Sequence, residues 1–205
     1  VEGEPLYVEE KSIMYLMARA AKQAGTPAIR TSSIRDVIAI KEETGLPVIG
    51  LVKVQYPGYE GFITPTMKEV DDLVAAGSDI VALDCTLRKR GDGSTVNEFI
   101  AQIREKYPDI ILMADISNYE EGINAWKCGV DIVGTTMSGY TAYTSSVSDG
   151  PDYELMERLS RDINIPVIGE GRIHYPDQAV KALQTGAWAI VVGGAITRPA
   201  IKESR

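Results

Sequence analysis

Short apolar runs rich in β-branched residues alternate along the chain with longer segments in which apolar residues recur every third or fourth position. Nearly continuous apolar runs are typical of strands covered on both faces in a parallel sheet, whereas the longer spacing is typical of a helix with one buried face. The pattern therefore predicts a repeated strand–helix unit. The predicted strands cover residues 27–30, 47–53, 79–84, 110–115, 131–136, 166–170 and 188–194.

Helices are predicted ahead of the first strand and between the strands, with one-sided apolar patterns clearest over residues 13–24 and 96–107. Capping-box spacing predicts two helix starts, at Thr66 with Glu69 and at Ser117 with Glu120. Glycine suits the left-handed conformation at a helix C-terminus. Such glycines shortly precede several predicted strands, at Gly25, Gly45, Gly77, Gly129 and Gly186.

These units fit two α/β architectures, an open doubly wound sheet and a closed (β/α)8 barrel. The predicted strands end on polar residues or glycines, namely Arg30, Lys53, Asp84, Asp115, Thr135, Glu170 and Gly193. In a barrel these ends converge on one mouth, where active sites of this fold are built, but an open sheet would spread them along an edge. We therefore expect residues 1–205 to form a single (β/α)8 TIM-barrel domain.

Only seven strands are found and the chain starts with a helical pattern. A complete barrel needs one more strand, which we expect to precede residue 1. A seven-stranded or broken barrel is the alternative.

The overall charge limits the class of partner. A formal net charge of −8 argues against nucleic acid and against an anionic membrane, since both recruit basic surfaces. Cys85 and Cys128 lack metal-site spacing, and His174 is the only histidine, so we expect no metal site and a reducing, cytoplasmic location. An anionic ligand would therefore need a local binding site.

The last two strand–helix junctions, "GEGRI" and "VVGGAITRP", are candidates for that site. Phosphate-binding barrels often hold the phosphate at these two junctions with backbone N–H groups. Gly171, Gly193 and Gly194 would let the backbone approach the phosphate, and Arg172 or Arg198 could supply charge. The alternative is that these glycines only form turns.

Lys53 and Glu170 end strands on opposite sides of the expected barrel. Such an acid and base could move a proton to and from a carbon next to a carbonyl, or they could form a structural ion pair. Arg30, Asp84 and Asp115 could orient sugar hydroxyls or form a salt network at the rim.

Eight segments of the chain carry a specific resemblance. They are "GEPLY" (3–7), "VIGLVK" (48–53), "FITPTMKEVD" (62–71), "ALDCTLRKR" (82–90), "LMADIS" (112–117), "VGTTMSGYT" (133–141), "GEGRIH" (169–174) and "VVGGAITRP" (191–199). Together they make the chain resemble the N-acetylmannosamine-6-phosphate 2-epimerase family over nearly its whole length.

This resemblance implies a cofactor-independent isomerase of amino sugar and sialic acid catabolism, acting on a phosphorylated amino sugar, and a homodimer. It implies catalytic roles for Lys53 and Glu170 and substrate contacts for Arg30, Asp84, Asp115, Thr136, Gly139 and Tyr140. The phosphate would be held by Gly171, Arg172, Gly193, Gly194 and Arg198. Two rival functions are another phosphosugar barrel enzyme that uses Lys53 and an inactive barrel that only binds a phosphosugar.

Overall fold

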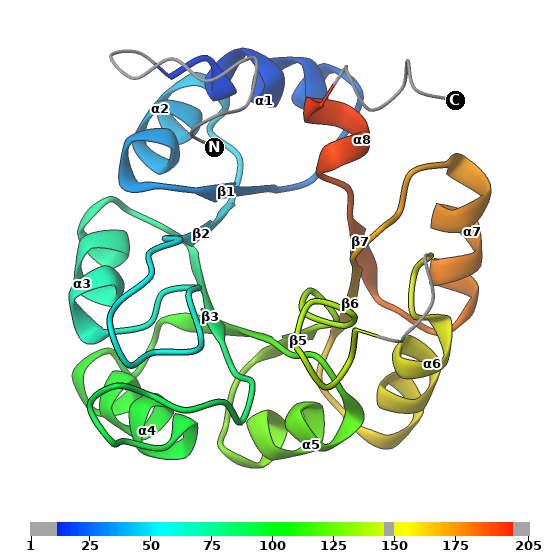
Figure 1. Ribbon diagram of the computed structural model, residues 1–205. Helices are drawn as coiled ribbons and strands as arrows, with labels where there is room; N and C mark the ends of the chain where they lie inside the picture. The colour runs from blue at the N-terminus through cyan, green and yellow to red at the C-terminus, as the bar shows by residue number, and fades with distance from the viewer. Residues whose placement is uncertain (1–11, 146–149, 199–205) are drawn as a thin grey trace.

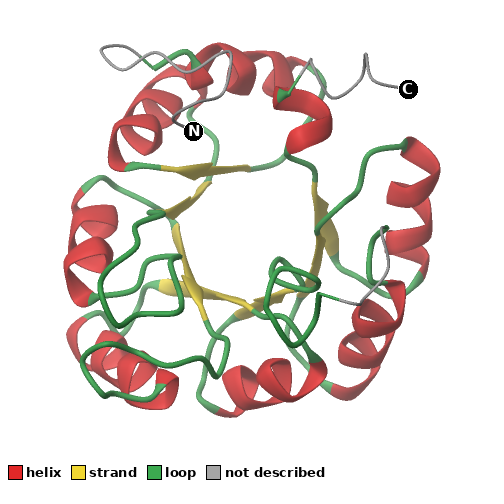
Figure 2. Cartoon of the chain, in the orientation of Figure 1, coloured by secondary structure: helices red, strands yellow, loops and turns green. Residues whose placement is uncertain are grey.

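The computed structural model describes residues 12–145 and 150–198. Its strands form one parallel sheet in which each strand pairs with the next along the chain. They are β1 (Ile29–Ser32), β2 (Val48–Leu51), β3 (Ile80–Asp84), β4 (Ile111–Asp115), β5 (Ile132–Gly134), β6 (Val167–Glu170) and β7 (Ala189–Val191). Figures 1 and 2 show these strands arranged around a centre with the helices outside them. The barrel architecture is thus confirmed over the open sheet.

The helices alternate with the strands as predicted. They are α1 (Met14–Gln23), α2 (Ile34–Thr44), α3 (Met67–Ala75), α4 (Val96–Lys106), α5 (Tyr119–Lys127), α6 (Tyr153–Asp162), α7 (Pro176–Gln184) and the short α8 (Gly194–Thr197). None of the described helices is both long enough and apolar enough to cross a membrane. The predicted helical faces of residues 13–24 and 96–107 correspond to α1 and α4.

Two apolar layers hold this arrangement together. One lies between the sheet and the helices and includes the outward strand residues Val81 and Leu83 with the helix residues Ile100 and Leu159. The other fills the inside of the barrel, with Ile49, Leu51, Ala82, Met113 and Ile168. Because side chains alternate between the two faces of a strand, successive residues supply the two layers in turn.

The turns that precede the strands follow the predicted glycine rule. Gly25, Gly45, Gly77, Gly129 and Gly186 all have positive φ, between 65° and 98°. An L-residue with a Cβ would be strained there, so these glycines set where α1, α2, α3, α5 and α7 end.

Several local predictions were wrong. The strands predicted over 131–136 and 188–194 end earlier, at Gly134 and Val191, and the strand predicted over 27–30 continues to Ser32. The cap of α5 is Asn118, whose side chain accepts a hydrogen bond from the N–H of Glu121, and not Ser117 with Glu120. The strand predicted to reach Lys53 ends at Leu51, after which the chain turns away from β3 and forms an isolated antiparallel bridge between Lys53 and Ile63. The box at Thr66 with Glu69 is confirmed.

Candidate active site

Rows of inward-facing strand residues end in polar groups at one mouth of the barrel. The row of β3 runs Ile80, Ala82, Asp84, and that of β4 runs Met113, Asp115. The same alternation continues to the polar ends of the other rows, Arg30, Lys53, Thr136 and Glu170. Apolar residues thus fill the inside of the barrel below the mouth, and charged and polar groups form the layer at the mouth.

A network of hydrogen bonds and ion pairs joins four of these groups. Arg30 lies against two carboxylates, with Nη2 2.7 Å from Asp115 Oδ2 and Nε 3.2 Å from Glu170 Oε2. The Thr136 hydroxyl lies 2.7 Å from Asp115 Oδ1 and 3.2 Å from Glu170 Oε2. Because Asp115 is fully buried, Arg30 provides the charge that a carboxylate in that position requires.

The network shifts the ionisation of Glu170. Burial raises the pKa of its carboxyl above the ordinary 4.5, and the neighbouring Asp115 carboxylate also raises it, while Arg30, Thr136 and Lys53 act in the opposite sense. The pKa of Arg30 is raised, since the attraction of Asp115 and Glu170 outweighs the burial that would lower it.

Lys53 is shifted in the opposite direction. The side chain is exposed through the open mouth. The protein around it nevertheless displaces enough water to lower the pKa below the ordinary 10.5, and the charge of Arg30 lowers it further, followed by that of Arg198. Glu170 and Asp115 raise it and only partly offset these effects. The structure therefore brings the proton affinities of Lys53 and Glu170 closer together.

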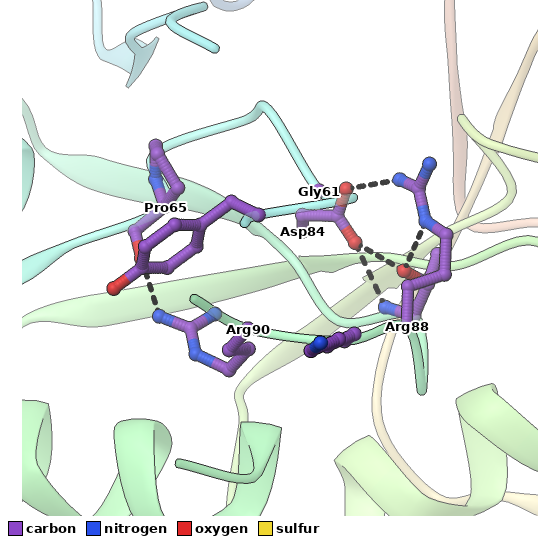
Figure 3. Close-up of a pocket in the computed structure, with 8 residues that line it drawn as sticks. Gly61, Pro65, Asp84, Arg88 and Arg90 are labelled. Atoms are coloured by element: carbon purple, nitrogen blue, oxygen red, sulfur yellow. Dashed lines mark hydrogen bonds and ion pairs between the residues drawn. The ribbon is translucent and has the colours of Figure 1, made fainter. Parts of the chain in front are cut away.

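Asp84 faces its own loop. Its carboxylate accepts hydrogen bonds from the N–H and hydroxyl of Thr86 and pairs with Arg88 at 2.5 Å. Figure 3 shows Asp84 turned toward Arg88, while the neighbouring Arg90 reaches the carbonyl of Pro65. These residues line a cavity of about 10 Å³ beside the mouth, which has room for roughly one water molecule. A direct substrate contact by Asp84 stays a prediction.

Arg172 holds the loop between β5 and α6. Its guanidinium donates to the carbonyls of Ser138 and Gly150, each at 2.8 Å, and lies 5.3 Å from the centre of the Tyr140 ring. Gly139 has φ +79°, and a Cβ there would collide with Arg172. Arg172, Gly139 and Tyr140 thus lie together, but the hydrogen bonds of Arg172 are with backbone carbonyls. Its role in phosphate binding stays a prediction.

The predicted phosphate positions lie at the ends of β6 and β7. Gly171 follows Glu170 with φ +114°, and Gly193 and Gly194 begin α8. Arg198 directly follows α8, the short helix that begins after the carboxyl end of β7, and its positive charge lowers the pKa of Lys53. Residues 12–145 and 150–198 contain no group of His, Cys, Asp and Glu that could hold a metal ion.

Comparison with protein families gives one match over almost the entire chain. The model described as "Putative N-acetylmannosamine-6-phosphate epimerase" matches residues 14–204. The chain belongs to this family. The resemblance expected from the sequence is thereby confirmed.

Curated relatives agree with this N-acetylmannosamine-6-phosphate epimerase family. A putative N-acetylmannosamine-6-phosphate 2-epimerase of Caldanaerobacter subterraneus is 55% identical over 97% of this chain and 83% of its own length. One from Clostridioides difficile is 47% identical over 97% of this chain and 87% of its own length.

Solved structures agree as well. The N-acetylmannosamine-6-phosphate 2-epimerase from Clostridium perfringens superimposes with a TM-score of 0.92 at 48% identity, covering 100% of this chain and 87% of its own. A thiamine phosphate pyrophosphorylase from Pyrococcus furiosus, at 20% identity and a TM-score of 0.63 over 97% of this chain and 86% of its own, shares the fold.

Three residues that support the epimerase-family site were not predicted as site residues. Thr135 accepts a hydrogen bond from the N–H of Glu170 at 3.0 Å and donates one to its carbonyl at 2.9 Å. Glu121 and Thr64 are buried and hold loops at the mouth. The sequence carries little signal for such roles, because Thr and Glu are common in loops and helices and only their partners distinguish them.

Proposed function

We propose that the chain interconverts N-acetylmannosamine 6-phosphate and N-acetylglucosamine 6-phosphate, as a 2-epimerase that needs no metal or organic cofactor. The observation that carries the proposal is the pair Lys53 and Glu170, whose pKa values are shifted toward each other at one barrel mouth in a member of the epimerase family. An acid and a base with perturbed pKa values at one site are typical of a proton-transfer site.

The chemistry follows from the substrate. When the sugar ring opens to the aldehyde, the proton at C2 becomes acidic because the resulting anion delocalises onto the carbonyl oxygen. One of Lys53 and Glu170 accepts this proton, and the other returns a proton to the opposite face of C2. The electron pair of the C2–H bond moves to the carbonyl oxygen and back again, so the configuration inverts without a change in oxidation state.

The electrostatics support both directions of the reaction. After one turnover, a proton has moved from one residue of the pair to the other. The state with charged Lys53 and charged Glu170 and the state with both neutral must therefore be close in free energy. Burial favours the neutral pair, since it raises the pKa of Glu170 and lowers that of Lys53. Arg30 holds Glu170 and can also stabilise the developing oxyanion.

Anchoring of the phosphate is assigned to the ends of β6 and β7. The backbone of Gly171 and of Gly193 with Gly194 lies at the two junctions where barrels of this type often hold a phosphate. Arg198 supplies a positive charge at this mouth. Since Arg172 donates to two carbonyls, its contribution to the phosphate would come through the loop that it orders.

Proton NMR in deuterium oxide tests the proposal. With N-acetylmannosamine 6-phosphate and no added metal, the wild-type protein should produce the gluco epimer with deuterium at C2. Lys53→Ala and Glu170→Ala should each slow epimer formation by on the order of 100- to 10,000-fold, the usual contribution of a positioned acid or base. Lys89→Ala, which removes an exposed lysine from the loop after β3, should stay near the wild-type rate.

The alternatives give different results. Exchange at C2 at the full rate in either Ala variant would contradict its acid–base role. A lysine adduct trapped by borohydride with substrate would favour an imine-forming barrel enzyme. Binding of the substrate without exchange or inversion would favour a binding protein.

A further inference from the structure

Lys53 is held by a segment that lies between β2 and β3 at the barrel mouth. After β2 ends, residues 52–54 run antiparallel to residues 62–64 of the same loop. The backbone N–H of Val54 donates to the carbonyl of Phe62 at 2.9 Å, and the backbone N–H of Asp84 in β3 donates to the carbonyl of Ile63 at the same distance. The segment 62–64 thus bonds both β3 and the residues that directly follow β2, while the β2–β3 pairs themselves extend only to Gly50 with Val81.

Thr64 makes the closest attachment in this segment. Its N–H donates to the carbonyl of Val52 at 2.7 Å, and its hydroxyl accepts from the Val52 N–H at 3.2 Å. The same hydroxyl donates to the carbonyl of Ala82 in β3 at 2.7 Å. Both backbone groups of the residue before Lys53 are therefore bonded to Thr64, and the hydroxyl connects the end of β2 to β3.

The backbone conformation of Thr64 is unusual. It has φ +46° and is fully buried. A β-branched residue rarely adopts positive φ, and such a conformation costs on the order of 1–3 kcal/mol. The strain persists because the surrounding hydrogen bonds fix the segment.

We propose that Thr64 is a positioning residue that fixes Lys53 at the mouth through the backbone of Val52, an inference that rests on the proposed proton-transfer function. A loss of the Thr64 hydroxyl leaves the N–H of Val52 and the carbonyl of Ala82 without this partner. The turn that carries Lys53 then loses the bond that ties Val52 to Ala82 of β3. The bond between the Asp84 N–H and the Ile63 carbonyl still joins this segment to β3.

The neighbouring loop supports the same segment. The backbone N–H of Glu60 donates to the carbonyl of Lys89 at 3.0 Å, and the Arg90 guanidinium donates to the carbonyl of Pro65 (Figure 3). The loop of Lys53 is thus fixed at several points, and the Thr64 side chain bonds the backbone of Val52, the residue before the lysine. On the other side of the site, Thr135 bonds both backbone groups of Glu170 in a similar way.

The test compares two buried threonines. Thr44, the last residue of α2, donates to the carbonyl of Ile40 at 2.7 Å and accepts from the N–H of Leu46 at 3.2 Å, which matches the hydroxyl distances of Thr64. It lies at the end of the barrel opposite the mouth. Thr64→Val should lower kcat by roughly 10- to 100-fold with little change in KM, because a small displacement of a catalytic group has effects of that size. Thr44→Val should leave kcat unchanged.

Two further variants separate positioning from stability. Thr64→Ser keeps the hydroxyl and should recover most of the wild-type kcat. Thr64→Gly accepts positive φ without strain but lacks the hydroxyl, so it should fold, as circular dichroism will show, and still lose kcat. A wild-type kcat in Thr64→Val or in folded Thr64→Gly would overturn the inference. Absence of epimerase activity in the wild-type protein would instead overturn the proposed function.

Discussion

At the scale of single residues, the pH dependence of the reaction should report the shifted acid–base pair. Activity needs one proton shared by Lys53 and Glu170, so kcat/KM should follow a bell-shaped curve. Because burial raises the pKa of Glu170 from 4.5 and lowers that of Lys53 from 10.5, both limbs should lie inside that range. A pH profile measured with N-acetylmannosamine 6-phosphate tests this prediction, and a limb outside the range contradicts it.

Replacement of Arg30 tests the direction in which its charge shifts the pKa values of Lys53 and Glu170. After burial, its charge is the next largest influence on both groups, and it lowers the pKa of each. In Arg30→Gln the limbs should therefore both move to higher pH, although removal of the partner of buried Asp115 also destabilises the fold. Profiles should be taken where circular dichroism shows folded protein. Movement of the two limbs in opposite directions would contradict this electrostatic assignment.

The sequence could predict where these residues lie better than what they contact. The end of an apolar run places Lys53, Asp115 and Glu170 at the mouth, because strand direction and side-chain alternation are local properties. The partners of Asp84 and Arg172 depend on loops that fold back from other parts of the chain. No pattern in the sequence fixes that geometry.

At the scale of elements, Glu121 of α5 joins three loops at the mouth. Its buried carboxylate accepts from the N–H and hydroxyl of Ser117, each at 2.7 Å, from the N–H of Leu87 at 3.1 Å, and from the hydroxyl of Tyr143. These groups belong to the loops after β4, β3 and β5. In Glu121→Gln an amide group replaces one acceptor oxygen with a donor, and the free energy of unfolding should fall by about 3 kcal/mol. Denaturant unfolding measures this change.

Glu120→Gln is the matched control, because Glu120 is exposed on the first turn of the same helix. It should cost no more than about 1 kcal/mol, the scale of an interaction with the helix dipole. Equal losses in the two variants would mean that Glu121 acts only through the charge of the helix terminus.

The helices and strands themselves were largely predictable, since periodicity and glycine turns act within a few residues. The errors came where tertiary contacts decide the outcome. Ser117 has the spacing of a cap, but its N–H and hydroxyl bond the buried Glu121, so Asn118 takes the cap position. The apolar run that includes Val52 predicts a strand, but the backbone N–H and carbonyl of Val52 are hydrogen-bonded to Thr64 and not to β3.

At the scale of the whole molecule, the convergence of polar strand ends favoured a barrel over an open sheet, and the structure confirms it. Within the described residues, the seven strands lie side by side in the sheet in the same order in which they occur along the chain. The single domain, the homodimer and the cytoplasmic location stay predictions. The proposed anionic substrate must be bound against a net charge of −8, so its affinity has to come from local groups and not from the mean charge of the protein.

Arg198 and Arg161 separate these two effects. Replacement of either arginine by Gln removes one positive charge from the molecule, but Arg198 lies at the mouth and Arg161 is an exposed residue of α6 that pairs with Asp162. Arg198→Gln should raise KM for N-acetylmannosamine 6-phosphate by roughly 10- to 100-fold, as expected for loss of a charged hydrogen bond. Arg161→Gln should leave KM unchanged. If KM rose equally in both variants, binding would depend on the net charge of the protein and not on the position of Arg198, because the two substitutions change the net charge by the same amount.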